Sequence, residues 1–444
     1  MTNCNQEWIE FPAVKRRKVQ AAFSGGDITS DGGALLLRDM DRRLGLLESV
    51  NRVLHDPRDS DRVVHSRLSR LRQRIYGLCL GYEDLNDHQE LRLDPALQTA
   101  VNRDTHLASQ ATLCRLENRM DRSAMVALHK VLVEQFIASF NKPPRKLILD
   151  FDATDDRVHG QQEKRFFHGY YNHYCFLPLY VFCGKQLLVS YLRPSNIDGA
   201  KHAWAILALL VKRLRQAWPN VKLIFRGDSG FCRPKMLDWC DRQDVGYVVG
   251  LAKNARLLGK VAIEREVAAD YFEATGEKVR FFESIRYAAG SWKSQRRVIA
   301  KIEHTDKGSN PRFIVTNLKG SSQSLYDRLY CARGEMENRI KEQQLGLFAD
   351  RTSSATLRAN QLRLYFSSFA YVLLHGLRRL GLTGTAFAKA QSTTIRLKLL
   401  KIGARLHLTV RKVWLSFSEA SPYASDIAQI LANLKQHPAW SPPG

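Results

Sequence analysis

Acidic side chains at three separate points of the chain have the types and spacing to hold a divalent cation. The first point is the run KLILDFDATDD at residues 146–156, which delivers Asp150 and Asp152. Successive side chains of a strand point to opposite faces, so these two carboxylates share one face while Leu149 and Phe151 pack the other. Two like charges there favour a bound cation. The alternative is a solvated strand end whose acidic residues only cap a turn.

The second point is Asp228, within the run VKLIFRGDSGFC at residues 221–232. A β-branched and aromatic segment ends there in Arg-Gly-Asp-Ser-Gly and passes into a helical pattern. Asp228 is therefore expected at the carboxyl end of a strand, where open α/β sheets place their ligands. The alternative is a helix N-cap, a role that Asp fills readily.

The third point is the run YCARGEMENRIKEQQ at residues 330–344, which is strongly helical by propensity. Arg333, Glu337 and Lys341 are spaced four apart, so they share one face of the expected helix. Taken alone, such a ladder of mixed charge is usually a solvated helix face. With the two strands it supplies a third carboxylate, on a helix downstream of both.

Together the three segments resemble the DDE transposases of bacterial insertion sequences, which place two Asp on strands and one Glu on a later helix. The helix carries most of the signature Y-x2-R-x3-E-x6-K of one superfamily of these enzymes, because Tyr330, Arg333 and Glu337 match it. The expected Lys is replaced by Gln344, and Lys341, about one turn earlier, could reach a phosphate instead.

Longer stretches are similar to the thirteen-eighty insertion-sequence branch of that superfamily. They are SDGGALLLRDMDRRLGL, LASQATLCRLENR, TDDRVHGQQEKRFFHGYYNHYCFLPLYVFCG, RGDSGFCR, RGEMENRIKE and ADRTSSATLRANQLRLYFSSFAYVLLHGLRR. The resemblance therefore extends from about residue 20 to about residue 420.

The resemblance implies that Asp152, Asp228 and Glu337 are catalytic residues and ligands of two Mg²⁺ ions, for which Mn²⁺ could substitute. Asp152 is preferred to Asp150 because Asp152-Ala153-Thr154 matches the D-x-T of the superfamily, with Asp150 kept as the alternative. Two such ions, roughly 3.5 to 4 Å apart, can activate an attacking oxygen and stabilise a leaving one. Hard oxygen ligands suit Mg²⁺.

The same resemblance implies that Tyr330, Arg333 and Lys341 contact DNA, with the two basic side chains holding phosphates beside the metals. The expected enzyme binds the terminal inverted repeats of its element, nicks the end with water, and lets the freed 3′-hydroxyl attack target DNA. Joining two ends calls for at least a homodimer in the DNA complex. A stand-alone ribonuclease-H-fold DNA nuclease and an inactive DNA-binding relative stay open as alternatives.

Composition favours a polyanionic partner. The chain has 444 residues, a formal net charge of +24 and a pI near 9.8. Double-stranded DNA fits better than a membrane, because no apolar stretch reaches the roughly 18 residues needed to span a bilayer. Residues 366–377 fit a core helix. The N-terminus lacks a signal-peptide pattern, so we expect a cytoplasmic, nucleoid-associated protein with no small-molecule substrate.

Cysteines and histidines give no sign of a zinc site. The eight cysteines stand at 4, 79, 114, 175, 183, 232, 240 and 331, without a C-x2-C pair, so reduced and mostly buried thiols are expected. For His159, His168 and His173, near the first acidic strand, a structural or DNA-contacting role is favoured over metal ligation.

The pattern predicts an α/β protein with a ribonuclease-H-like catalytic core and a β-rich insertion, preceded by an all-helical N-terminal DNA-binding region. The predicted divisions are residues 1–140 for the helical region, 141–255 and 321–385 for the core, 256–320 for the insertion and 386–444 for a basic C-terminal region. Three early strands followed by alternating helices and strands carry the assignment of the core.

Two clusters of basic residues are further candidates for DNA contact. The first lies in the helical region and comprises His65, Arg67, Arg70, Arg72 and Arg74. The second lies in the C-terminal region and comprises Arg396, Lys398, Lys401, Arg405 and Arg411. Each could instead be a solubilising face. Clustering within a helical module favours phosphate binding for the first, and recognition of the element's ends is expected there.

One aromatic residue of the expected insertion has two possible roles. Trp292, close to Lys293 and Arg296, could stack on an extruded base, which contributes about 1 to 3 kcal/mol per base. A tryptophan in a β-insertion more often fills a core. The resemblance implies that the insertion lies beside the active site and handles the DNA end.

Overall fold

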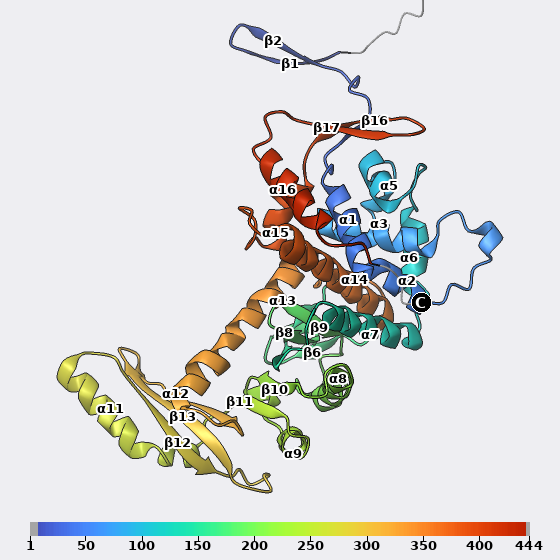
Figure 1. Ribbon diagram of the computed structural model, residues 1–444. Helices are drawn as coiled ribbons and strands as arrows, with labels where there is room; N and C mark the ends of the chain where they lie inside the picture. Colours follow the sequence, from blue (N-terminus) through green and yellow to red (C-terminus); the bar gives the residue numbers. More distant parts are fainter. Residues whose placement is uncertain (1–7, 441–444) are drawn as a thin grey trace, which may run out of the picture. The chain divides into compact units, whose positions relative to one another are not determined.

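The computed structural model describes residues 8–440 and forms two compact units (Figure 1). Unit 1 comprises residues 8–51, 56–114 and 376–440, and unit 2 comprises Arg52–His55 and Arg115–His375. All six residues expected to bind metal or DNA at the catalytic centre belong to unit 2. In the described part of the chain, no helix is both long and apolar enough to cross a membrane.

Unit 2 is built on one large mixed sheet. Its strands, in order across the sheet, are β12 (Val279–Tyr287), β13 (Arg296–Thr305), β15 (Arg312–Thr316), β11 (Gly246–Leu251), β10 (Lys222–Gly227), β4 (Lys146–Ala153), β8 (Leu179–Cys183) and β9 (Gln186–Tyr191), with β14 (Gly308–Ser309) paired to β13. β4, β10 and β11 are parallel to one another, and the remaining pairs are antiparallel. A small second sheet joins β5 (Asp156–Arg157), β7 (His173–Phe176) and β6 (Phe166–His168).

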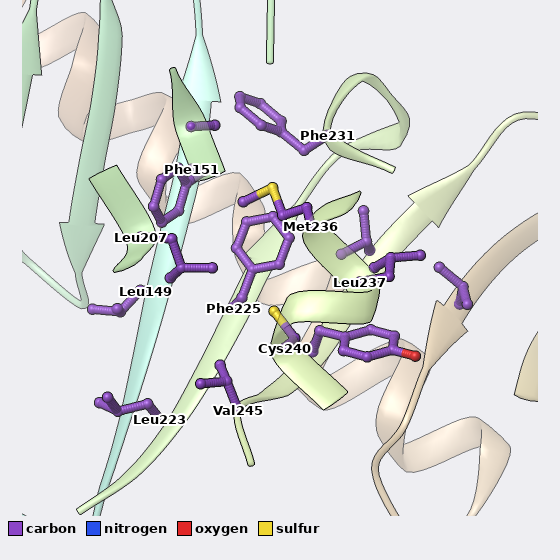
Figure 2. Close-up of a cluster of buried hydrophobic side chains, with 14 of the residues drawn as sticks. Leu149, Phe151, Leu207, Leu223, Phe225, Phe231, Met236, Leu237, Cys240 and Val245 are labelled. Atoms are coloured by element: carbon purple, nitrogen blue, oxygen red, sulfur yellow. The ribbon is translucent and has the colours of Figure 1, made fainter. Parts of the chain in front are cut away.

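The three parallel strands are apolar along most of their length because both of their faces are covered. On one face, Leu149 and Phe151 of β4 and Phe225 of β10 belong to the main core (Figure 2). Helices α8 (Ala203–Ala217) and α9 (Pro234–Arg242) complete that core with residues such as Leu207 and Met236. Helix α7 (Arg122–Ala138) contributes Val133 and Phe136 to the same core.

The opposite face of the sheet carries a smaller apolar cluster. The chain runs from this cluster to the helix that carries Glu337. Val248 of β11 packs in the cluster with Leu325 and Tyr326. These two residues open the π-helix η3 (Leu325–Tyr330), which continues through the 3-10 turn η4 (Cys331–Arg333) into helix α13 (Gly334–Leu347). Helix α14 (Leu357–Gly376) follows and is the long apolar helix expected around residues 366–377.

The strands expected in the catalytic core are present, with two local differences. The run predicted as one strand at 174–184 is divided at Pro178, because proline cannot donate to a strand ladder. Within 256–320 the sequence pattern indicated only strands, whereas the chain first forms helices α10 (Ala255–Gly259) and α11 (Ala262–Thr275). The strands that follow extend the large sheet next to β11.

Unit 1 is mainly helical but contains two hairpins. Its helices are α1 (Ala34–Leu44), α2 (Leu46–Val53), α3 (Arg67–Leu80), α4 (His88–Leu91), α5 (Pro95–Val101), the start of α6 (Gln110–Asn118), α15 (Ser392–Ile395) and α16 (Ala424–Lys435), with π-helices η5 (Leu377–Gly381) and η6 (Arg396–Leu400) and the 3-10 turn η1 (Ser60–Arg62). Its strands are β1 (Ile9–Val14), β2 (Arg17–Ala21), β3 (Ile28–Thr29), β16 (Ala404–Leu408) and β17 (Val413–Phe417).

The prediction of an all-helical N-terminal region is therefore wrong in part. Strands β1 and β2 form a hairpin that pairs Ile9 with Ala21 and Phe11 with Val19. These strands, IEFPAV and RKVQA, span only five or six positions and do not alternate regularly, so they give no strand signal beside the longer helical patterns.

The prediction of a basic DNA-facing surface on α3 is also wrong. Arg70 and Arg74 are each only 3% exposed. All four arginines have partners within unit 1: Arg67 donates to Asn51, Arg70 pairs with Asp56, Arg72 with Asp41, and Arg74 donates to the carbonyl of Glu83. These side chains hold the helices of unit 1 to one another and to the loops between them.

The cysteines within residues 8–440 are all free thiols. Cys79, Cys175 and Cys240 are buried, while Cys114 and Cys331 are exposed. Cys4 lies outside the described residues. Burial raises the pKa of the Cys240 thiol to about 12, which keeps it protonated and unreactive.

Candidate active site

Asp150 and Asp152 lie on the same face of β4, as the alternation predicted, and each meets an arginine. Asp150 is 2% exposed and faces Arg226, its partner in the parallel register with β10. Both carboxylate oxygens of Asp150 accept hydrogen bonds from Arg226, one from Nε and one from Nη2 at 2.6 Å. The third guanidinium nitrogen, Nη1, donates to the carbonyl of Leu329. Arg226 thus ties β4 and β10 to the π-helix η3.

The side chain of Asp152 is more exposed than that of Asp150, and other carboxylates lie near it. Its Oδ2 lies 3.5 Å from Nη1 of Arg333, and its side chain is 13% exposed. Burial raises the pKa of Asp152 to about 7, and the negative charges of Asp228 and Glu337 add to this effect while Arg333 opposes it. Asp228 and Glu337 therefore lie close enough to Asp152 to repel its negative charge.

Asp228 directly follows β10, at its carboxyl end. It is also the N-cap of the 3-10 turn η2 (Ser229–Phe231), because its Oδ1 accepts a hydrogen bond of 2.8 Å from the backbone N–H of Gly230. Asp228 is therefore both at the expected end of a strand and an N-cap, and its role as a ligand stays a prediction. The cap fixes the direction of the carboxylate.

Glu337 lies in the first turn of α13, and its side chain is 48% exposed. Its Oε1 accepts a hydrogen bond of 3.0 Å from Nη2 of Arg333, one turn earlier. Arg333 thus bridges Asp152 and Glu337, carboxylates that come from a strand and a helix 185 residues apart (337 − 152).

The backbone just before Glu337 departs from α-helical geometry. The π-helix η3 and the 3-10 turn η4 precede α13, and they carry Tyr330 and Arg333. Segments of π-helix are rare and often occur at functional sites, because the wider turn re-aims the side chains that follow it. No propensity signal in the sequence indicated this irregularity.

Gly250 is a site residue that the sequence did not reveal. A Cβ at this position of β11 would lie 2.6 Å from the hydroxyl oxygen of Tyr330 and 2.7 Å from the backbone nitrogen of Ser229. Only glycine permits β11 to approach both the segment after Asp228 and the segment before Glu337. Burial raises the pKa of the Tyr330 hydroxyl.

The last signature position, Gln344, and its possible substitute, Lys341, lie farther along α13. Lys341 is exposed, one turn after Glu337. Gln344, which replaces the expected Lys, donates a hydrogen bond of 3.1 Å from Nε2 to the carbonyl of Asp155, just beyond the end of β4. Gln344 therefore helps to fix α13 against the end of that strand.

Trp292 and His173, for which the sequence left alternative roles open, both have partners within unit 2. Trp292 packs at the margin of the main core and meets Tyr287 edge to face, with ring centroids 5.6 Å apart, which supports a core role. His173 pairs with Asp155 at 2.8 Å. Within residues 8–440, no group of three or more His, Cys, Asp and Glu side chains has the arrangement of a metal site.

The donor chemistry of the three carboxylates nevertheless fits a hard divalent cation. Asp152, Asp228 and Glu337 offer oxygen atoms only, which suit Mg²⁺ or Mn²⁺. Burial and the negative charges of Asp228 and Glu337 raise the pKa of Asp152, and a bound cation would offset both effects. In the present conformation, the positive charge that links Asp152 to Glu337 is the guanidinium of Arg333.

The sequence matches the family described as Transposase DDE domain group 1 over residues 11–439. Among solved structures, the chain is similar to the piggyBac transposase in a cryo-EM synaptic complex with hairpin DNA, with a TM-score of 0.42 and 10% sequence identity over 83% of this chain and 79% of that chain. No curated protein matches the sequence. Since the family match spans nearly the whole chain, the protein belongs to the DDE transposases of this group.

Proposed function

We propose that this DDE transposase binds the terminal inverted repeats of a bacterial insertion sequence of the thirteen-eighty branch, and that it cleaves and transfers DNA strands in a metal-dependent reaction. The observation that carries the proposal is the convergence of three carboxylates from β4, the end of β10 and α13. Asp228 and Glu337 lie close enough to Asp152 to add to the effect of burial, which raises the pKa of Asp152 to about 7. A structural ion-pair network would instead neutralise its acidic groups one by one.

In this proposal Asp152, Asp228 and Glu337 are the catalytic residues and hold the metal ions. Asp152 is preferred to Asp150 because Arg226 already engages both oxygens of Asp150. When bound, two Mg²⁺ or Mn²⁺ ions supply Lewis-acid activation of the attacking oxygen and stabilisation of the leaving one. Arg226 and the cap of Asp228 keep the protein's side of the site rigid.

Tyr330, Arg333 and Lys341 are the proposed DNA contacts. Arg333 is placed to exchange its bonds to Asp152 and Glu337 for a phosphate, since a guanidinium binds carboxylates and phosphates with the same fork of donors. Lys341 is exposed one turn beyond Glu337 and can act as a second phosphate contact.

The ribonuclease-H-like assignment of the core belongs to this proposal. It is supported by the order β9-β8-β4-β10-β11, in which three antiparallel strands come first in the chain and parallel strands alternating with helices follow. The boundaries at 140, 255, 320 and 385 stay predictions. The two compact units instead divide near residues 114 and 375.

Double-stranded DNA is the proposed partner, both as transposon end and as target, and a homodimer is the proposed assembly on it. The net charge of +24 supports the partner, because neutralising phosphates releases the counterions of DNA. A cytoplasmic, nucleoid-associated location follows from this partner and stays a prediction.

The test is strand cleavage and joining of labelled duplexes that carry the element's terminal repeats, with Mg²⁺. Asp152→Asn, Asp228→Asn and Glu337→Gln are each expected to lower cleavage about 10²- to 10³-fold while DNA binding persists, a range typical for loss of one electrostatic catalytic group. Glu335→Gln is the matched control, since it removes the same charge from an exposed position two residues from Glu337.

Each alternative predicts a different result. Cleavage without joining by the native chain would favour a nuclease. DNA binding with no cleavage under any divalent metal would favour an inactive relative. If all three variants cleaved like the native chain, the assignment of the carboxylates would be wrong.

A further inference from the structure

The hairpin β16–β17 of unit 1 has two faces of different chemistry. Its register pairs Leu406 with Leu415 and His407 with Trp414. Because side chains alternate, one face is apolar and the other is basic and aromatic. The apolar face comprises Ala404, Leu406, Leu408, Val413, Leu415 and Phe417, and the second face comprises Arg405, His407, Lys412, Trp414 and Ser416.

The apolar face packs on its own unit at the base of the hairpin. Ala404 and Leu406 are buried. Phe417 lies so close to Gly32 that a Cβ there would be 2.7 Å from the ring. The basic face must therefore point away from the unit.

Every member of the basic face is exposed, and Trp414 is 54% exposed although it is a large aromatic residue. The ammonium of Lys412 lies 4.2 Å from the centroid of the Trp414 ring, and the indole N–H of Trp414 donates to the hydroxyl of Ser416 at 3.0 Å. These contacts hold the indole in place on the surface. Because the indole is already held in one position, binding through it costs less conformational entropy.

The sequence around the hairpin is basic and has no acidic residue of its own, although Lys401 pairs with Asp31 from the N-terminal part of unit 1. From Arg351 to Ser418 the chain contains no Asp or Glu, and Glu419 is the first acidic residue after Asp350. At the tip, Thr409 and Lys412 close a tight turn through backbone hydrogen bonds, and the two residues between them are Val410 and Arg411. The tip therefore offers Arg411 and Lys412 beside the indole.

We propose that this hairpin, resting on the transposase function proposed above, enters the major groove of duplex DNA with its basic face toward the bases and phosphates. The major groove is about 12 Å wide and admits a two-stranded ribbon. β3 pairs with β16 at Ala404 and Arg405, and the backbone N–H of Leu406 donates to the carbonyl of Asp27, so the hairpin is two-stranded from His407 outward. Figure 1 shows its two strands (red) side by side, joined by a single turn.

The dimensions agree with that placement. Three residue pairs, the last formed by Thr409 and Lys412, extend beyond Leu406, which gives about 10 Å at 3.3 Å per residue, compared with a groove depth of about 8.5 Å. Arg405 and Lys412 then reach phosphates or guanine edges, and Trp414 makes an apolar contact such as that with a thymine methyl group.

The test measures DNA affinity of the full-length chain in a chelator, so that no cleavage intervenes. Arg405→Ala/Lys412→Ala is expected to weaken binding at least tenfold at 150 mM salt and to reduce the slope of log affinity against log salt by about 2, one unit for each lost phosphate contact. Arg62→Ala/Lys435→Ala removes the same charge from exposed positions of unit 1 and should leave the slope unchanged.

Trp414→Ala tests insertion into the major groove separately from electrostatic attraction to the DNA phosphates. It is expected to abolish interference by guanine N7 methylation, a major-groove mark, with little change in the salt slope, whereas Trp414→Phe should keep part of the interference. Unchanged affinity, slope and interference in these variants would overturn the proposal. Loss of self-association in place of DNA binding would identify the hairpin as a protein interface and would also overturn it.

The two proposals fail in different ways. A native chain that binds duplex DNA but never cleaves it would contradict the transposase function alone. Hairpin variants that bind DNA like the native chain would contradict the groove placement alone.

Discussion

Two carboxylate–arginine pairs lie two residues apart on one face of β4, and they differ in every property that matters for chemistry. The inner pair, Asp150 with Arg226, is nearly closed to solvent and bonded through both carboxylate oxygens. The outer pair, Asp152 with Arg333, is longer at 3.5 Å and lies among other carboxylates. A complete hydrogen-bond set makes the inner pair structural. An incomplete set leaves the outer pair able to exchange partners.

The largest effect on stability is expected from breaking the inner pair. Arg226→Met leaves the Asp150 carboxylate buried without a partner, which costs about 3 to 5 kcal/mol. The measurement is the free energy of unfolding, or Tm where unfolding is irreversible. A loss below about 1 kcal/mol would contradict a structural role.

A double variant sharpens that result. Asp150→Leu/Arg226→Met is expected to restore most of the stability, because apolar residues of similar volume often replace a buried ion pair at little cost. It does not restore the hydrogen bond to the Leu329 carbonyl, so cleavage should stay at least tenfold below native. Native cleavage by this double variant would show that Arg226 does not position the segment before Glu337.

The outer pair is expected to respond to pH in the opposite sense from an ordinary salt bridge. The pKa of Asp152 is about 7 in the folded chain against 3.8 for an unperturbed carboxyl, so the folded state holds the proton more tightly. Its contribution therefore favours folding below about pH 4 and is lost as pH rises to about 7. Asn does not ionise, so the Asp152→Asn variant does not lose this stability as the pH rises.

The gain in stability from Asp152→Asn should accordingly grow between pH 5 and pH 8 and approach 4 kcal/mol at most, since 7 − 3.8 is 3.2 units at about 1.36 kcal/mol each. Thermal unfolding of the metal-free chain measures it, with Glu335→Gln as the control of equal charge. Addition of Mg²⁺ should reduce the difference in stability between Asp152→Asn and the native chain, because the ion stabilises only the native chain. A pH-independent gap would contradict the assigned repulsion.

A smaller effect is expected at Gly250 of β11, which lies beside Tyr330 and the backbone of Ser229. Gly250→Ala places a methyl group in contact with Tyr330 and the backbone of Ser229, which costs about 1 to 3 kcal/mol of overpacking and displaces the site. Cleavage should fall 10- to 100-fold. Gly290→Ala is the control, because nothing lies within 4 Å of its added Cβ. Equal activity of the two variants would remove Gly250 from the site.

The smallest effect is expected at the departure from the family signature. Gln344 already bonds to the Asp155 carbonyl, and a lysine could donate to the same oxygen. Gln344→Lys should therefore change cleavage by less than about threefold, within the usual range for a preserved hydrogen bond. A gain of tenfold or more would mean that the native chain lacks a phosphate contact that its relatives use.

The two basic clusters show where prediction from sequence reached its limit. Arginines spaced along α3 and basic residues near β16 gave the same signal in the sequence. In the fold, Arg72 pairs with Asp41 and Arg396 donates to the carbonyls of Cys79 and Leu78, whereas Arg405 stays exposed. Partners distant in sequence decide which charges remain available, and local spacing contains no information about them.

The amino-acid sequence by itself determined the parts of this protein that depend on local pattern. Alternation in residues 146–153 placed Asp150 and Asp152 on one face of a strand, and the order of strands and helices indicated the large mixed sheet of the core. The signature around Glu337 indicated the family that the match over residues 11–439 supports. Periodicity and turn residues act over a few positions, so they can be recognised directly.

Only the tertiary structure decided how those parts are used. It paired Asp150 with Arg226 and left Asp152 beside Arg333, and it required Gly250 where β11 approaches Tyr330. Each of these outcomes depends on a contact between residues about 75 or more positions apart. Desolvation and charge pairing act through space, so the difference between a carboxylate fully engaged by an arginine and one left beside other carboxylates arises only once the chain is folded.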